Sequence, residues 1–128
     1  MNKLVLIVDD DESLRTLLMQ VIEKKGFRVE SAGDGRTALE KAKTDHPDLI
    51  VLDYMLPEME GFEVIKRLQL SDTTRHIPVL LMTSRPVDPE SVKMIHEESN
   101  VQGFLQKPIK IATFLNMLDQ ILTPGLKA

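Results

Sequence analysis

Cysteine and tryptophan are absent from this chain of 128 residues, and aromatic residues make up only 4% of it. The absence of cysteine excludes a disulfide framework and a thiolate metal site. No apolar run approaches the roughly 18 residues that a membrane-spanning helix needs. The first residues also lack the apolar stretch and cleavage site of a signal peptide. We therefore expect a cytoplasmic protein with no membrane contact.

An excess of positive charge is lacking as well. The formal net charge is −4, which argues against direct binding to nucleic acid. Hydrophobic residues make up 42% of the chain and charged residues 28%, as in a globular domain. A chain of this length can bury one substantial core. We expect residues 1–123 to form one domain and residues 124–128 to form a short tail.

Short apolar runs alternate with segments of helical periodicity along the chain. Such alternation predicts an α/β fold, with parallel strands and helices on both faces of the sheet. Continuous apolar strands are typical of strands buried on both faces. The expected strands are 4–8, 27–32, 49–52, 79–83 and 103–105. Helices are expected from 14 to about 25, around 38–42, over 62–70, from near Pro89, and over 111–122.

Acidic residues stand where two of the expected strands end. Asp9 and Asp10 follow the first strand, and Asp53 follows the third. The carboxyl ends of parallel strands meet at one edge of a sheet, so we expect these carboxylates to lie close together. Like charges at such an edge repel unless a cation lies among them. The pattern indicates a Mg²⁺-dependent phosphoryl site with a carboxylate nucleophile.

Several motifs together make the chain similar to the receiver domain of bacterial response regulators. The resemblance covers residues 4–122, with the motifs in the order and at the spacing of the family. They are Val8-Asp9-Asp10, Asp53 within the run from Leu52 to Gly61, Ile77-Pro78-Val79 leading to Thr83-Ser84, and Lys107-Pro108 after Gly103-Phe104. The resemblance implies a flavodoxin-like sandwich of five strand-helix units, with a parallel sheet in the order 2-1-3-4-5.

The resemblance also implies a role for each site residue. Asp53 would be the phosphoacceptor, and Lys107 and Thr83 would contact the phosphoryl oxygens through an ammonium and a hydroxyl. Mg²⁺ would be bound by Asp10, Asp53 and the backbone carbonyl of Met55, with Asp9 acting through water. In the family the Lys-Pro bond is commonly cis, which here is the bond between Lys107 and Pro108.

Phosphorylation in this family shifts an equilibrium between two states. The implied switch residues are Thr83 and Phe104, and the implied readout surface comprises the fourth helix, fifth strand and fifth helix. Many relatives carry tyrosine where this chain has Phe104, which lacks the tyrosine hydroxyl. The lifetime of the phosphoryl group would depend on Met55 and Arg85. Neither suits the orientation of an attacking water, so we expect a long-lived phosphorylated state.

The partners implied are a sensor histidine kinase or phosphotransfer protein and a downstream protein target. The domain would be a monomer or a phosphorylation-dependent dimer, with no catalysis beyond its own phosphorylation and slow dephosphorylation. One alternative is a pseudo-receiver, an interaction module with an unused site. Another is a phosphohydrolase similar to haloacid dehalogenases, although their nucleophile lies on the first strand in an Asp-x-Asp pattern.

Each motif taken singly also has an ordinary structural explanation. Asp9, Asp10 and Asp11 could be a solvated cluster at a helix start. Asp53 could begin a turn before the proline loop, and Lys107-Pro108 could be a turn only. Thr83 could be an ordinary strand residue and Phe104 plain core. The explanations for the acidic run, Asp53, Lys107-Pro108 and Thr83 would all have to hold at strand ends together, which favours the functional interpretation.

Overall fold

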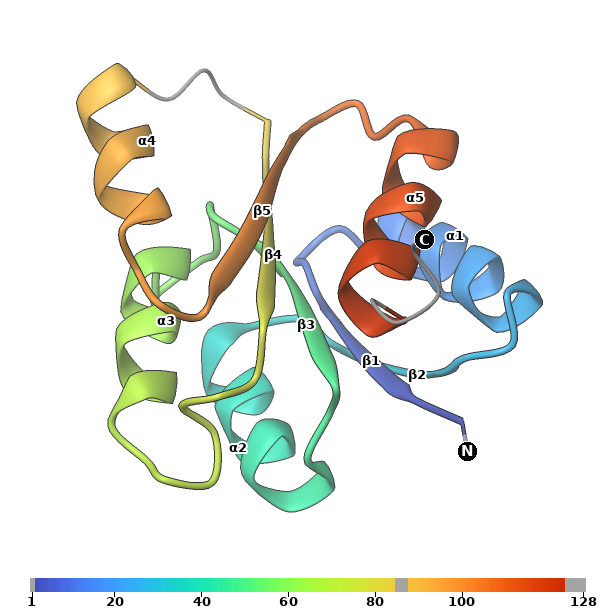
Figure 1. Cartoon of the computed structure of the whole chain (residues 1–128), viewed down its shortest axis with the longest axis horizontal. Helices are drawn as coiled ribbons and strands as arrows, with labels where there is room; N and C mark the ends of the chain where they lie inside the picture. The colour runs from blue at the N-terminus through green and yellow to red at the C-terminus, as the bar shows by residue number, and fades with distance from the viewer. Residues whose placement is uncertain (1, 85–87, 124–128) are drawn as a thin grey trace.

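The computed structural model describes residues 2–84 and 88–123. Strands and helices alternate strictly along these residues, as Figure 1 shows. The strands are β1 (Leu4–Val8), β2 (Arg28–Ala32), β3 (Leu49–Asp53), β4 (Val79–Thr83) and β5 (Val101–Gln106). The helices are α1 (Glu12–Lys24), α2 (Gly35–Asp45), α3 (Gly61–Gln69), α4 (Pro89–His96) and α5 (Ile111–Leu122).

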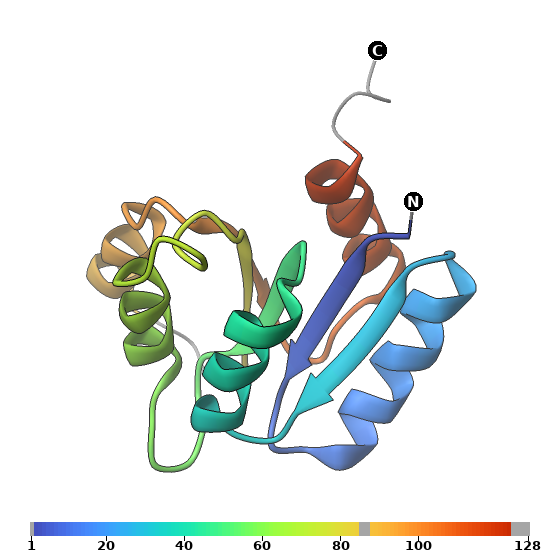
Figure 2. The same cartoon turned by 90° about the horizontal axis from the view of Figure 1, so that it is seen from below.

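All pairings in the sheet are parallel, and the strand order is β2-β1-β3-β4-β5. Helices α1 and α5 cover one face of the sheet, and α2, α3 and α4 cover the other, as the two views in Figures 1 and 2 show. The predicted fold class and strand order are therefore confirmed. The predicted tail, 124–128, lies outside the described residues.

Two hydrophobic clusters, one on each face of the sheet, form the core. Every residue of β1, β3 and β4 is buried, which agrees with the continuous apolar runs seen in the sequence. Successive side chains of a strand point to opposite faces, so Leu6 packs under α2 and α3 while Ile7 packs under α1 and α5. In the described residues no helix combines the length and apolarity needed to cross a bilayer.

The fifth strand differs from its prediction, because it begins at Val101 rather than Gly103. A register irregularity pairs Val79 with Val101 and the next residue, Leu80, with Gly103. Gln102 in between is exposed, so the sequence there lacks an apolar run. An edge strand can carry such a polar residue. Because Gln102 interrupts the apolar pattern, the first part of β5 could not be predicted from the sequence.

Gly61, the first residue of α3, allows the chain to pass directly over the end of β3. Its amide donates to the carbonyl of Tyr54 at 2.8 Å. A Cβ added at Gly61 would stand 2.7 Å from the Tyr54 Cα and 3.0 Å from the Asp53 carbonyl oxygen, and backbone atoms cannot move aside easily.

We expect Gly61→Ala to lower the free energy of unfolding by about 2–3 kcal/mol, measured by urea denaturation. Gly33→Ala is the matched control, because its new methyl would meet only the flexible guanidinium of Arg15. Equal stability of the two variants would contradict the expectation.

Candidate functional site

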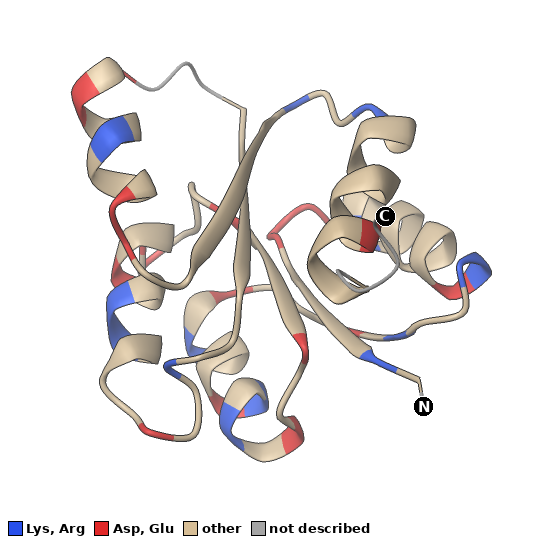
Figure 3. Cartoon of the chain, viewed as in Figure 1, with Lys and Arg blue, Asp and Glu red and all other residues tan. Residues whose placement is uncertain are grey.

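The predicted site residues lie at one edge of the sheet, where the strands end. Asp9 and Asp10 follow β1, Asp53 and Thr83 are the last residues of β3 and β4, and Lys107 follows β5. Figure 3 shows acidic residues, in red, in the loop that leaves β1. The amide of Lys107 donates to the Thr83 carbonyl at 2.7 Å, which extends the pairing of β4 and β5 up to the site.

The ammonium of Lys107 bridges two carboxylates. Its Nζ lies 2.7 Å from Asp9 Oδ2 and 3.2 Å from Asp53 Oδ2. The Asp9 side chain is completely buried, that of Asp53 is 4% exposed and that of Lys107 is 18% exposed. Ion pairs this well shielded from water are stronger and less screened by salt than surface pairs. Positions 9, 53 and 107 thus form one electrostatic unit despite their separation in sequence.

Asp9, Asp10 and Asp53 each offer a carboxylate oxygen within 4.8 Å of the others. Asp10 is exposed, whereas the other two are buried. Three carboxylate oxygens with one side open to water suit Mg²⁺, which prefers oxygen ligands and keeps several of its waters. The donor set therefore fits the expected ion.

Asp11 belongs to the helix and lies outside this trio. Its side chain accepts hydrogen bonds from the amides of Ser13 and Leu14 and so caps α1. The explanation of the acidic run as a helix cap thus holds for its third member. Asp9 instead accepts from the Asp11 amide through Oδ1 and from Lys107 through Oδ2.

Met55 lies beside the candidate nucleophile, in the loop after β3. Its amide donates to Asp53 Oδ1 at 3.0 Å, and Lys107 contacts Oδ2, so both oxygens of the Asp53 carboxylate are engaged. The other residue expected to affect the phosphoryl lifetime, Arg85, lies outside the described residues.

The two expected switch residues lie on the same face of neighbouring strands. Thr83 is buried at the end of β4. Phe104 of β5 pairs with Leu81, which lies two residues before Thr83 on β4. Phe104 is partly buried against the cluster under α3 and α4. Its ring centroid lies 6.4 Å from that of His96 at the end of α4. Phe104 therefore connects β5 with α4.

The electrostatic environment acts in opposite ways on Asp53 and Lys107. Burial and the nearby charge of Asp9 raise the pKa of Asp53, although the Met55 amide and Lys107 oppose that shift. Burial alone would lower the pKa of Lys107, but its bond to Asp9 and the charge of Asp53 outweigh burial and raise it. Lys107 therefore stays positively charged. The ionised form of Asp53 is disfavoured unless further positive charge lies nearby.

The raised pKa of Asp53 makes the stability of the metal-free protein depend on pH. The folded state holds this proton more tightly than the unfolded chain does. The resulting stability is fully present below the ordinary pKa of 3.8 and is lost as the pH rises through the folded-state pKa. We therefore expect Asp53→Asn to gain stability relative to wild type as the pH rises from 4 to 7.5. Urea unfolding in the presence of a chelator measures this difference.

Addition of Mg²⁺ should reverse the stability advantage of Asp53→Asn over wild type. At 100 times its dissociation constant, a ligand of the folded state stabilises it by about 2.7 kcal/mol. Wild type should show a gain of this size, and Asp53→Asn should show much less. Asp72→Asn is the control, since the Asp72 side chain is 92% exposed and pairs with Arg75 in its own loop. If the difference in free energy of unfolding between wild type and Asp53→Asn does not change with pH, the pH prediction is wrong.

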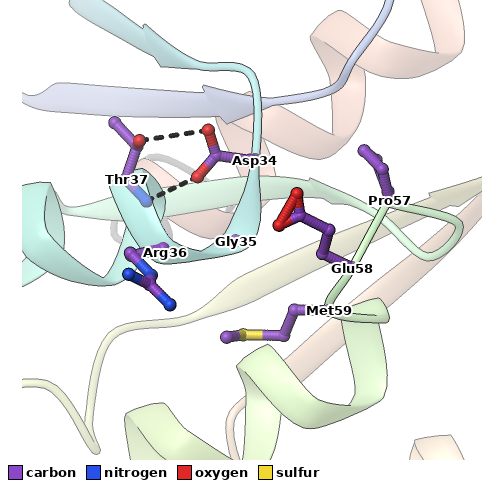
Figure 4. Close-up of a pocket in the computed structure, with 7 residues that line it drawn as sticks. All are labelled: Asp34, Gly35, Arg36, Thr37, Pro57, Glu58 and Met59. Carbon is purple, nitrogen blue, oxygen red and sulfur yellow. Dashed lines mark hydrogen bonds between the residues drawn. The ribbon is translucent and has the colours of Figure 1, made fainter.

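Away from the acidic trio, a hollow of about 370 Å³ lies between the start of α2 and the loop after β3 (Figure 4). Asp34 lines it, but both oxygens of Asp34 are occupied by Thr37, one by the amide and one by the hydroxyl. These bonds lower the pKa of Asp34 and cap α2. Asp34 and Thr37 thus serve the end of α2.

Sequence reasoning missed one residue that contacts the site. Arg15 Nη1 donates to the backbone carbonyl of Asp9 at 2.6 Å. Its place in the first turns of α1, directly after the acidic run, was a signal that could have found it. No ordinary motif assigns such a role to a helical arginine.

The profile of the response regulator receiver domain matches residues 5–119. This chain belongs to the response regulator receiver domain family. Receiver domains are the phosphorylation-activated signalling modules of two-component systems, so the predicted family and general function are confirmed.

Named relatives of this receiver domain include both long and short proteins. It is 44% identical to the alkaline phosphatase synthesis transcriptional regulatory protein PhoP of Bacillus subtilis over 108 residues, which cover 84% of this chain and 43% of PhoP. It is 42% identical to the response regulator PleD of Caulobacter vibrioides over 109 residues, which cover 85% of this chain and 24% of PleD. The chain thus spans less than half of either protein.

Other relatives are similar over nearly their whole length. The polar-differentiation response regulator DivK of Brucella ovis is 33% identical over 122 residues, 95% of this chain and 98% of DivK. Among solved structures, the chemotaxis response regulator CheY4 of Vibrio cholerae superposes with a TM-score of 0.85 at 32% identity. That match covers 94% of this receiver domain and 99% of CheY4.

Proposed function

We propose that Asp53 of this receiver domain accepts a phosphoryl group from the phosphohistidine of a sensor kinase or phosphotransfer protein. An oxygen of the Asp53 carboxylate attacks phosphorus, and the bond from phosphorus to the histidine nitrogen breaks. The products are an acyl phosphate on Asp53 and a free histidine on the donor. The observation that carries this proposal is the Lys107 ammonium, which lies within 3.2 Å of both Asp9 and Asp53.

The residues around Asp53 supply orientation and charge. The Met55 amide holds one oxygen of Asp53 and so fixes the direction of the carboxylate. Lys107 offers a positive charge to the phosphoryl oxygens, and Thr83, at the end of the adjacent strand, offers a hydroxyl donor. Mg²⁺, bound by Asp10, Asp53 and the Met55 carbonyl with Asp9 acting through water, would neutralise charge on the phosphoryl group.

The signal would leave the site through Thr83 and Phe104 to the face formed by α4, β5 and α5. The contact of Phe104 with His96 supports this route, because it joins β5 to the end of α4. A downstream protein would bind that face in a phosphorylation-dependent way. The domain would act as a monomer or a phosphorylation-dependent dimer, without direct nucleic-acid or membrane contact, in the cytoplasm. Its only chemistry would be its own phosphorylation and slow dephosphorylation.

Incubation with a small-molecule phosphodonor and Mg²⁺, followed by intact-mass measurement, tests the proposal. One phosphoryl group should be gained, and peptide mapping after borohydride trapping should locate it at Asp53. A chain that gains no phosphoryl group would be a pseudo-receiver. Steady release of phosphate from a phosphomonoester would instead indicate a phosphohydrolase.

A long-lived phosphorylated state is the expected consequence of the apolar side chain at Met55. This residue is half-buried beside Asp53 and has no group that could orient a water for attack on the acyl phosphate. We expect Met55→Asn, which introduces such a group, to shorten the lifetime severalfold in Mg²⁺ buffer. Loss of the label from wild type within seconds, with no phosphatase present, would refute the expectation.

A further inference from the structure

The peptide bond between Asp9 and Asp10 places the Cα from which the exposed carboxylate of the trio extends. The peptide unit is planar, so the direction of the Asp9 carbonyl also sets the position of the Asp10 Cα. The carbonyl of Asp9 accepts from Arg15 Nη1 at 2.6 Å. Arg15 is therefore hydrogen-bonded to the peptide group that links the buried Asp9 to the exposed Asp10.

The rest of Asp9 is held from other directions. Its amide donates to the Ala32 carbonyl at 3.1 Å, and its carboxylate oxygens are bound by the Asp11 amide and by Lys107. These contacts fix Asp9 itself, but none of them contacts the carbonyl. The guanidinium supplies that remaining constraint.

The β2–α2 loop is shaped to admit the guanidinium. A Cβ added at Gly33 would lie 3.2 Å from Arg15 Nη1 and 3.8 Å from its Cζ. The glycine thus leaves room for the guanidinium beside the loop. Arg15 itself is half-buried, which strengthens a charge-assisted bond to a carbonyl.

We propose that Arg15 is a positioning residue that holds the Asp9–Asp10 peptide so that Asp10 faces the metal site. This inference rests on the proposed Mg²⁺-dependent function. Arg15 also brings a positive charge near the trio, and that charge alone would oppose cation binding. Removal of Arg15 therefore has opposite effects in the two cases: weaker Mg²⁺ binding if Arg15 positions the peptide, and tighter binding if only its charge matters.

Titration calorimetry with Mg²⁺ distinguishes the two. We expect Arg15→Met to weaken Mg²⁺ binding about 10-fold, as is typical when a residue that orients a ligand is lost. Arg15→Lys, which keeps a cationic donor, should restore part of this loss. Arg75→Met is the charge-matched control, because Arg75 lies exposed in the loop before β4, at the opposite edge of the sheet, and should leave Mg²⁺ affinity unchanged.

Gly33→Ala provides an independent test if Arg15→Met fails to fold. Its methyl should displace the guanidinium and weaken Mg²⁺ binding severalfold in the wild-type background. Where Arg15→Met does fold, adding Gly33→Ala to it should weaken Mg²⁺ binding no further. Unchanged or tighter binding in Arg15→Met, or in Gly33→Ala when the arginine variant is unfolded, would overturn the proposal.

The wild-type protein separates this inference from the proposed function. If wild type neither binds Mg²⁺ nor gains a phosphoryl group, the proposed function fails and the inference fails with it. If wild type does both and the Arg15 variants bind Mg²⁺ as tightly, only the role of Arg15 is refuted.

Discussion

An Asp53→Asn variant is expected to gain no phosphoryl group under conditions that label the wild type completely. The amide nitrogen of asparagine replaces a carboxylate oxygen and cannot form an acyl phosphate by the same attack. The variant should still fold, because Lys107 keeps its 2.7 Å contact with Asp9 and the side chain at position 53 keeps its size. Intact-mass measurement over time gives the result directly.

Two further variants test whether the loss of phosphorylation is specific to position 53. Asp72→Asn removes a carboxylate far from the site and should be labelled at the wild-type rate. Asp10→Asn should be labelled slowly, because it removes the exposed ligand of the trio but leaves the nucleophile intact. Labelling of Asp53→Asn at the wild-type rate would show that another residue is the acceptor.

Lys107→Met should lower the rate of phosphorylation by roughly 10²- to 10³-fold, the usual cost of removing a charge that stabilises a transition state. Methionine keeps most of the side-chain length but leaves no ammonium for the phosphoryl oxygens. The same change leaves Asp9 fully buried without its cation, so the metal-free protein should also lose about 3 kcal/mol of stability. Both effects follow from the loss of one ammonium, and the labelling rate and the unfolding curve measure them separately.

Lys110→Met is the control for this variant, because Lys110 is exposed three residues further along the same loop. It should change neither the labelling rate nor the stability. Addition of Mg²⁺ should restore part of the stability of Lys107→Met, since the ion can replace the missing positive charge among the carboxylates. A wild-type labelling rate in Lys107→Met would contradict a role for its ammonium.

The place of the acidic site residues in the fold could be predicted from the sequence. Apolar runs define the strands, and parallel strands end at a common edge, so residues that follow the runs must lie near one another. This reasoning places Asp9, Asp10 and Asp53 together, and the resemblance to receiver domains adds Lys107 to them. The alternation of apolar and amphipathic segments likewise predicted the three layers.

The contacts of each side chain could not be predicted in this way. Asp9 and Asp10 are adjacent and chemically identical, yet one is fully buried against Lys107 and the other is exposed. Their difference depends on the turn that leaves β1. Arg15 is a comparable case, because helical periodicity does not reveal that its guanidinium returns to the Asp9 carbonyl.

Hydrophobic periodicity and strand ends are local properties of the chain, so the class of fold and the positions of the acidic residues can be predicted without coordinates. The motifs along the chain, through their resemblance to receiver domains, add the family and the other site residues. Three contacts become visible in the folded structure alone: Lys107 bridges Asp9 and Asp53, Asp11 caps α1, and Arg15 donates to the Asp9 carbonyl. These contacts depend on backbone direction and burial, which arise only when distant segments pack together. The chemistry of the site is thus present in the chain, but its geometry is a property of the fold.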